Sequence, residues 1–236
     1  MLKHNFLNRR HFLYGSTLAV GATLSGCMAP LQAELPVETP VQTPQEALAR
    51  LIAGNERYAA NHSLPFNESV QRRTEVAQGQ HPFATIFSCV DSRVPPELVF
   101  DRGLGDLFVI RTAGHVIDEA VLGSLEFGVA ELKIPLLMVM GHASCGAVKA
   151  TLEAVEHHEE APASIGYLVK GITPAVEEAS QEAGYTLDTC ININVAMTVK
   201  RLREAPILAE AIAQDQLLIV GARYELETGK VEMIEI

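Results

Sequence analysis

Two short apolar runs that each end in possible metal ligands constrain the fold of this chain more than any other feature. The first run spans residues 83–88 and is followed by Cys-Val-Asp-Ser-Arg at 89–93. The second spans residues 134–141 and is followed by His-Ala-Ser-Cys at 142–145. Short runs rich in Ile, Leu, Val and Phe are typical of buried parallel strands. We therefore expect two strand ends that each carry half of one site.

The remainder of the chain predicts an α/β fold. Two further apolar runs, at 107–111 and 217–221, are also too short for helices and have the composition of strands. Because strands mostly alternate with helical patterns, we expect a single α/β domain with a mostly parallel central β-sheet flanked by helices. The helical patterns cover residues 44–61, 68–78, 119–132, 147–157, 165–183 and 188–203, and the first begins with the capping-box sequence Thr-Pro-Gln-Glu at 43–46.

Charge and cysteine content narrow the function classes. The chain has 236 residues and a formal net charge of −11 at pH 7, which disfavours binding to nucleic acid. Its four cysteines could form two disulfides in an exported protein, but Cys89 and Cys145 lie close to Asp or His residues at ligand spacing. We interpret these two cysteines as metal ligands. Cys190 lies in a helical pattern, and we expect it to be a buried thiol without a further role.

The N-terminal segment resembles a twin-arginine export signal. An Arg-Arg pair at 9–10 precedes a mildly apolar stretch of about a dozen residues, which is too short to span a membrane. That stretch ends in Leu-Ser-Gly-Cys at 24–27, which resembles the lipobox of bacterial lipoproteins. We expect residues 1–26 to be a signal peptide, Cys27 to be lipidated and residues 27–43 to form a flexible tether. The protein would then be exported to the periplasmic side and held at the membrane only by its lipid; the alternative is a plain cleaved signal in which Cys27 is incidental.

Four side chains with metal-binding groups follow the two predicted strands: Cys89, Asp91, His142 and Cys145. In a parallel sheet, ligands bind outside the carboxyl ends of the strands, near the point where the chain reverses its winding direction. Two thiolates, one imidazole and optionally one carboxylate form a tetrahedral set suited to Zn²⁺, whereas Mg²⁺ would require oxygen ligands. Cys145 also precedes a predicted helix, whose first free N–H groups favour a thiolate. The residues therefore predict a zinc site.

The motifs at 89–93 and 142–145 resemble the two zinc motifs of the β-class carbonic anhydrases. The likeness extends from Gly-Asn-Glu-Arg at 54–57 to Gly-Ala-Arg-Tyr at 221–224, and so covers nearly all of the chain outside the export segment and the tether. This resemblance implies a catalytic domain of the β-carbonic anhydrase fold at residues 44–236. It also implies a zinc lyase that converts CO₂ and water reversibly to bicarbonate and a proton.

The same resemblance implies roles for the residues of the two motifs. Cys89, His142 and Cys145 would hold Zn²⁺ permanently, while Asp91 would either complete the coordination or pair with Arg93. With Asp91 held by Arg93, water can take the fourth position; its pKa at a catalytic zinc falls to about 7, so that zinc-bound hydroxide can attack CO₂. Two thiolates should make the zinc less electrophilic, which predicts activity favoured by alkaline pH.

Further roles are implied outside the motifs. Gln80 occupies the place of the family's glutamine that hydrogen-bonds substrate across a dimer interface, and Phe108 and Phe127 align with the apolar wall of the substrate pocket. The alternatives are that Gln80 is only a turn residue and that Phe108 and Phe127 are ordinary core aromatics. A homodimer or larger homo-oligomer is thus implied. Some members of the family bind inhibitory bicarbonate with a tryptophan at the position of Ile86, so that this regulation is not expected here. His115 could relay protons or make a structural hydrogen bond.

Two other functions remain open at this stage. The same fold and metal can support hydrolysis of a CO₂ analogue such as carbonyl sulfide or carbon disulfide. A zinc-stabilised binding protein without turnover is the third possibility. The presence of both Asp91 and Arg93 argues against it, because a structural zinc needs no releasable fourth ligand.

Overall fold

The structure, a computed structural model, describes residues 38–236. The predicted signal peptide at 1–26, Cys27 and the first part of the predicted tether lie outside the described residues. Within the described part of the chain, no helix has both the length and the apolar composition that crossing a membrane requires.

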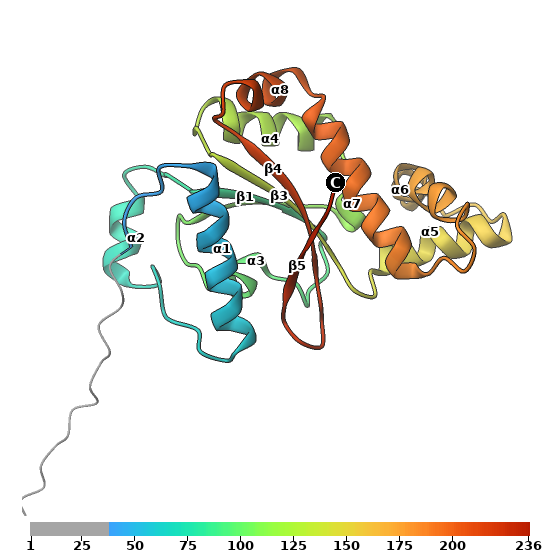
Figure 1. Ribbon diagram of the computed structural model, residues 1–236, viewed down its shortest axis with the longest axis horizontal. Coiled ribbons are helices and arrows are strands. Elements are labelled where there is room, and N and C mark those ends of the chain that lie inside the picture. Colours follow the sequence, from blue (N-terminus) through green and yellow to red (C-terminus); the bar gives the residue numbers. More distant parts are fainter. Residues whose placement is uncertain (1–37) are drawn as a thin grey trace, which may run out of the picture. The chain divides into compact units, whose positions relative to one another are not determined.

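A five-stranded sheet forms the centre of the domain (Figure 1). The strand order is β2-β1-β3-β4-β5; the first four strands are parallel, and only β5 runs antiparallel, beside β4. The prediction of an α/β domain with a mostly parallel central sheet is therefore confirmed. The strands are β1 (Ala84–Ser88), β2 (Leu107–Arg111), β3 (Leu136–His142), β4 (Leu218–Tyr224) and β5 (Val231–Ile234).

The strand order places the reversal of winding between β1 and β3. The chain passes from β1 outward to β2, and then returns across β1 to place β3 on the other side. Ser88 at the end of β1 is in register with Met140 near the end of β3. Crevices at such switch points are where α/β sheets bind their ligands. The two predicted half-sites therefore emerge next to each other.

Helices cover both faces of the sheet. The six predicted helices are present, with ends that differ from the predicted bounds by four residues or fewer. Two short helices, α3 and α8, and the strand β5 were not predicted. The helices are α1 (Pro44–Ala59), α2 (Val70–Val76), α3 (Pro96–Val99), α4 (Glu119–Ala130), α5 (Gly146–His157), α6 (Ile165–Ala179), α7 (Leu187–Arg203) and α8 (Pro206–Ala213), with a 3₁₀ turn η1 (Ala113–His115).

Alternating side chains of the central strands build two separate core layers. Phe87 and Val139 pack with α4, α7 and α8 on one face of the sheet. Ile86 and Met138 pack with α1 and α3 on the other face. Every residue of β1 and β3 is buried, and each fully buried apolar side chain contributes about 1.5–3 kcal/mol. The two strands that lead to the site are thus the most firmly held part of the sheet.

A third apolar cluster lies where α5, α6 and α7 pack together, at the right of Figure 1. Val148 of α5, Ile172 of α6 and Ile191 of α7 are fully buried in it. Cys190 is also fully buried there, so the prediction of a buried thiol is confirmed. Cys89 and Cys145 lie in the same cluster, which therefore forms the floor of the predicted metal site.

The described end of the predicted tether is docked on the domain rather than extended away from it. Glu38 accepts two hydrogen bonds, at 2.6 and 2.7 Å, from Nη1 of Arg102, whose side chain is only 1% exposed. Val41 packs against the core layer under α1. A buried guanidinium needs a counter-charge, and Glu38 supplies it. At Thr43, Oγ1 accepts from the backbone N–H of Glu46 at 3.1 Å, which confirms the predicted capping box.

Candidate metal centre

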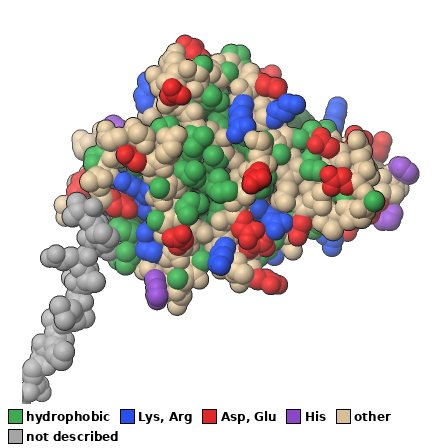
Figure 2. Space-filling view, viewed as in Figure 1, with side chains coloured by type: hydrophobic (Ala, Val, Ile, Leu, Met, Phe, Trp, Pro, Cys, Tyr) green, Lys and Arg blue, Asp and Glu red, His purple; other side chains and the backbone are tan. Residues whose placement is uncertain are grey.

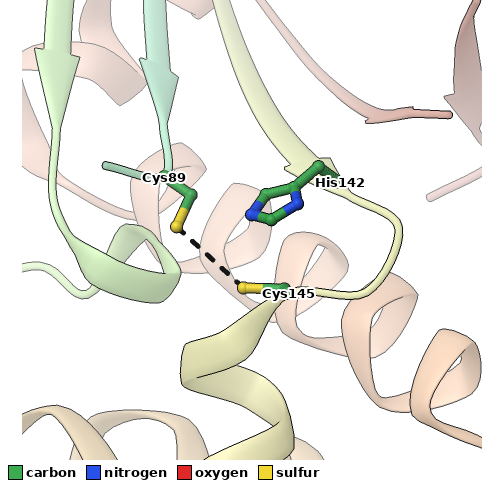
Figure 3. A group of neighbouring side chains, drawn as sticks. All are labelled: Cys89, His142 and Cys145. Atoms are coloured by element: carbon green, nitrogen blue, oxygen red, sulfur yellow. Dashed lines mark hydrogen bonds between the residues drawn. The ribbon is translucent and has the colours of Figure 1, made fainter. Parts of the chain in front are cut away.

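Three buried side chains from separate elements converge at the ends of β1 and β3 (Figure 3). Cys89 directly follows β1, His142 is the last residue of β3, and Cys145 is the N-cap residue of α5. Their donor atoms all lie within 4.8 Å of one another, and the two Sγ atoms are 4.0 Å apart. The structure thus brings together three of the four predicted ligands.

The imidazole of His142 presents one nitrogen to this group. Its Nδ1 lies 3.0 Å from the carbonyl oxygen of Ala143, so Nδ1–H donates there. This fixes the tautomer and leaves the lone pair on Nε2. Nε2 is buried and has no hydrogen-bond partner among the described residues, an arrangement that costs stability unless a ligand occupies it. Metal-binding histidines are oriented in this way by a second hydrogen bond, so the arrangement fits a cation.

The two thiols are electrostatically linked. A hydrogen bond with Cys145 lowers the pKa of Cys89 well below its usual range, against the opposing effect of burial, and the backbone N–H of Gly114 helps by donating to Cys89 Sγ at 3.4 Å. The same contact, together with burial, raises the pKa of Cys145, although backbone N–H groups at the start of α5 act in the opposite direction. Two adjacent thiolates require a compensating positive charge, which a divalent cation with affinity for sulfur would supply.

Asp91 lies beside this group but is paired with Arg93. Arg93 donates from Nε to Oδ1 at 2.9 Å and from Nη2 to Oδ2 at 2.7 Å, and its backbone N–H donates to Oδ1 at 2.9 Å. These hydrogen bonds hold the pKa of Asp91 well below its usual range, against some burial. Asp91 Oδ2 lies 3.8 Å from Nε2 of His142. Of the two arrangements expected for Asp91, the structure adopts the pair with Arg93.

Arg111, which the sequence did not single out as a site residue, fixes the backbone between Cys89 and Asp91. It is the last residue of β2, and it donates from Nε to the carbonyl oxygen of Cys89 at 2.8 Å and from Nη2 to that of Asp91 at 2.7 Å. The sequence did offer a signal for this role: Arg111 ends the predicted strand at 107–111, and the carboxyl ends of neighbouring parallel strands lie at the same edge of the sheet.

Gly114 and Asn194 form a second support that the sequence did not reveal. Gly114 has a φ of +61°, and a Cβ there would lie 2.5 Å from Cδ1 of Ile172. Asn194 of α7 donates from Nδ2 to the carbonyl oxygen of Gly114 at 3.1 Å and contacts Nε2 of His115 at 2.9 Å. No local pattern connects Asn194 to a turn 80 residues earlier.

His115 is buried, which agrees with the alternative that this residue makes a structural hydrogen bond. Its side chain lies edge-on to Phe87 and hydrogen-bonds Asn194. Burial lowers the pKa of His115 to about 4, although the nearby Cys89 acts in the opposite direction. His115 is therefore neutral at pH 7.

The three predicted substrate residues are not at the metal centre of the same chain. Gln80 is exposed and precedes β1, at the opposite end of that strand from Cys89. Phe108 lies opposite Thr85 in the register of β2 and β1, and Phe127 is on α4 with 48% of its surface exposed. Gln80 therefore lies beyond one end of β1 and Cys89 beyond the other, while Phe108 is in register with a residue four positions before Cys89.

Comparisons with known proteins agree with this arrangement. Residues 84–231 match the family model described as "Carbonic anhydrase". Over 181 residues the chain is 42% identical to a carbonic anhydrase of Mycolicibacterium smegmatis, which covers 76% of this chain and 88% of that protein. The structure of the β-carbonic anhydrase CcaA aligns with a TM-score of 0.65 at 27% identity, over 80% of this chain and 95% of that one. A tetrameric β-carbonic anhydrase from Sordaria macrospora aligns with a TM-score of 0.65 at 21% identity, over 81% and 98%, which supports the fold alone.

Proposed function

Because this chain belongs to the carbonic anhydrase family, in its β class, we propose that it catalyses the reversible hydration of CO₂ to bicarbonate and a proton with Zn²⁺ as its metal. The observation that carries the proposal is the buried group of Cys89, His142 and Cys145, which is held at the end of the two most buried strands. Two sulfur donors and one nitrogen donor match the preference of Zn²⁺ over Mg²⁺ or Ca²⁺.

The residues around the donors prepare the site for this chemistry. When bound, Zn²⁺ would supply Lewis acidity, which at three-histidine sites lowers the pKa of a coordinated water to about 7; two thiolates are expected to leave that pKa higher. His142 would bind through Nε2, because Nδ1–H is committed to the carbonyl oxygen of Ala143. Gly114 would stabilise the thiolate of Cys89 through its N–H. Because two thiolates are expected to leave the pKa of the coordinated water above 7, activity should rise toward alkaline pH.

Asp91 and Arg93 would keep the fourth coordination position available. Arg93 holds the carboxylate ionised and bidentate, so Asp91 is drawn away from the three donors while staying 3.8 Å from His142 Nε2. In this position Asp91 can accept a hydrogen bond from a water molecule beside the metal and orient it toward CO₂. Arg93 would act through Asp91 as a positioning residue.

We propose that the substrate pocket is completed by a second copy of the chain. The metal-site end of β1 carries Cys89 and the opposite end carries Gln80, so Gln80 of one copy would serve the centre of another. β2 is an edge strand that pairs only with β1, and its side chains are half-buried. Figure 2 shows a further apolar patch in the middle of one face. Edges and patches of this kind are common at interfaces between subunits, and Phe108 and Phe127 would add the apolar pocket wall.

Stopped-flow CO₂ hydration by the purified, zinc-loaded protein tests the proposal. We expect turnover that increases from neutral to alkaline pH. Asp91→Asn should lower activity at least tenfold with zinc content unchanged, because a hydrogen bond to a charged group contributes about 1.5–3 kcal/mol. Glu97→Gln, which changes an exposed carboxylate on α3, is the matched control and should leave activity unchanged. Full activity of Asp91→Asn would refute the role of the Asp91–Arg93 pair.

Release of sulfide from carbonyl sulfide, measured on the same preparation, separates the hydrolase alternative from CO₂ hydration. We expect CO₂ to be the faster substrate. Sulfide release without measurable CO₂ hydration would reassign the reaction while leaving the metal centre in place. Absence of both activities in a zinc-loaded protein would favour a binding protein.

We also propose that the protein is exported and anchored by a lipid on Cys27. The proposal rests on the Arg-Arg pair at 9–10 and on the Leu-Ser-Gly-Cys sequence that ends at Cys27. In fractionated bacterial cells, the full chain should sediment with membranes, and Cys27→Ser should move it to the soluble periplasmic fraction. Replacing the pair at 9–10 with Lys-Lys should retain it in the cytoplasm. Membrane association that survives Cys27→Ser would exclude the lipid anchor.

A further inference from the structure

The turn beside Cys89 contains two consecutive residues in the left-handed region of backbone conformation. Gly114 has a φ of +61° and His115 has a φ of +45°. Glycine adopts this conformation freely, whereas it is uncommon and strained for a residue with a side chain such as histidine. Strained residues persist only where the surrounding structure holds them, and they cluster at functional sites. Contacts from outside the turn must therefore hold its shape.

One side chain, that of Asn194 on α7, contacts both residues of this pair. Its Nδ2 donates to the carbonyl oxygen of Gly114 at 3.1 Å and lies 2.9 Å from Nε2 of the His115 ring. Asn194 is 5% exposed and His115 is 2% exposed, so water does not compete for these hydrogen bonds. The amide of Asn194 thus fixes the carbonyl of one left-handed residue and the ring of the next.

This shape of the turn aims a backbone donor at a sulfur of the metal centre. The N–H of Gly114 donates to Sγ of Cys89 at 3.4 Å. A hydrogen bond to a thiolate withdraws electron density from the sulfur, so that the sulfur gives less charge to a bound cation. Hydrogen bonds to sulfur ligands tune metal sites in this way. The effect matters most where two thiolates bind one metal, because each of them reduces its Lewis acidity.

We propose that Asn194 is a positioning residue of the metal centre: it holds the turn of Gly114 and His115 so that the Gly114 N–H stays on Cys89 Sγ and weakens this thiolate as a donor. A metal bound there is then more electrophilic than two thiolates without hydrogen bonds would leave it. Asn194 acts only through Gly114. Its role rests on the metal centre proposed above and not on which substrate is turned over.

The Co²⁺-loaded protein reports the donor strength of the thiolates, because its near-ultraviolet absorption includes a sulfur-to-metal charge-transfer band. Asn194→Leu keeps the approximate size of the side chain but removes its N–H groups. We expect the band to move to longer wavelength, since a thiolate without its hydrogen bond gives up electrons more readily. Zinc affinity, measured by competition with a chelator, should fall about tenfold or more, as it does for other residues that support metal ligands.

Asn192→Leu is the matched control. Asn192 lies on the same helix, and its Oδ1 has no hydrogen-bond partner among the described residues. Both the charge-transfer band and the zinc affinity should therefore stay as in the wild-type protein. A band that does not move in Asn194→Leu would overturn the proposal, because a purely structural role lowers stability without changing the thiolate.

A measurement on the wild-type chain applies even if Asn194→Leu does not fold. In the ¹¹³Cd-loaded, ¹⁵N-labelled protein, an N–H···S hydrogen bond should transmit a scalar coupling between ¹¹³Cd and the amide proton of Gly114. Absence of this coupling would mean that Gly114 does not donate to the metal-bound sulfur of Cys89, and the role of Asn194 would be refuted.

The outcomes also separate this role from the proposed reaction. In an active enzyme, the pH profile of CO₂ hydration should move to higher pH in Asn194→Leu, because a less electrophilic metal makes its coordinated water less acidic. A band that moves in a protein without CO₂ hydration would support the role of Asn194 while refuting the reaction. If Co²⁺ gives no sulfur charge-transfer band in the wild-type protein, both the metal centre and the role of Asn194 are refuted.

Discussion

Single hydrogen bonds decide what the residues of the metal centre can do. Nδ1 of His142 is committed to the carbonyl oxygen of Ala143, so only Nε2 can bind a metal. Asp91 is held in two places by Arg93, so it remains ionised and beside the three donors rather than among them. The hydrogen bonds between Arg93 and the charged Asp91 are the stronger ones, at about 1.5–3 kcal/mol each, whereas the neutral bond that orients His142 contributes about 0.5–1.5 kcal/mol.

A prediction at this scale concerns the buried ring of His115. Its pKa of about 4 in the folded chain lies below its ordinary value of 6.5, so between these values the unfolded chain binds more protons and stability falls as pH falls. From pH 7 to pH 5 this residue should lower the free energy of unfolding by about 2 kcal/mol. Urea unfolding of the zinc-loaded protein at both pH values measures the loss.

His115→Gln is the comparison for that measurement. The variant keeps a polar side chain but cannot gain a proton, so its loss of stability between pH 7 and pH 5 should be smaller by about 2 kcal/mol. The contribution of the metal ligands is common to both proteins and cancels in the difference. Equal losses in the two proteins would mean that His115 does not stay neutral in the folded state.

At the scale of elements, the turn η1 is held from three sides. Asn194 of α7 binds its carbonyl oxygen, while Ile172 of α6 and Ala147 of α5 leave no room for a side chain at Gly114. The N–H of the same glycine points at the thiolate of Cys89. Packing among three helices is thereby linked to the charge on one metal ligand.

Gly114→Ala should break this link. The new Cβ would meet Ile172 at 2.5 Å, at a backbone φ of +61°, and strain with overpacking costs about 1–3 kcal/mol each. We expect a lower free energy of unfolding in urea and faster loss of zinc to a chelator. Gly123→Ala is the matched control, since a Cβ there meets nothing within 4 Å; it lies inside α4 and should stabilise the chain by about 0.5–1 kcal/mol. Zinc loss at the same rate in both variants would show that the conformation of η1 does not influence zinc binding.

At the scale of the whole molecule, the proposed site residues lie at opposite ends of β1. Cys89 and Asp91 lie at the carboxyl end, whereas Gln80 precedes the other end and is exposed. A strand separates them, so a site that uses all three must draw on two copies. Such an arrangement makes activity depend on assembly and protein concentration.

Complementation between inactive chains tests this dependence. Asp91→Asn and Gln80→Ala should each be weakly active alone. Mixed at equal amounts under subunit exchange, half of the dimers are mixed and one of their two sites is intact, so about a quarter of wild-type CO₂ hydration should return in symmetric dimers. Mixing the proteins without exchange is the control. If exchange restores nothing, Gln80 does not act across the interface.

Strands and helices could be predicted from the sequence better than contacts between residues that are distant along the chain. Apolar runs and helical periods are set by neighbouring residues. The strand at 107–111 and the two strands that lead to Cys89 and His142 could therefore be predicted from the sequence, as could the mostly parallel type of the sheet. β5 escaped prediction because only four residues pair at the sheet edge. The docking of Glu38 depends on the buried Arg102 far along the chain, which no local pattern contains.

Residue type and spacing alone identified Cys89, His142 and Cys145 as candidate metal ligands, because these residues follow the apolar runs that become β1 and β3. Only the tertiary structure decided that Asp91 pairs with Arg93, that Arg111 fixes the loop, and that Asn194 holds Gly114 against Cys89. The physical reason is distance along the chain. Strand and helix formation responds to nearby residues, whereas these supports arise from contacts that exist only after β2 and α7 have packed beside β1.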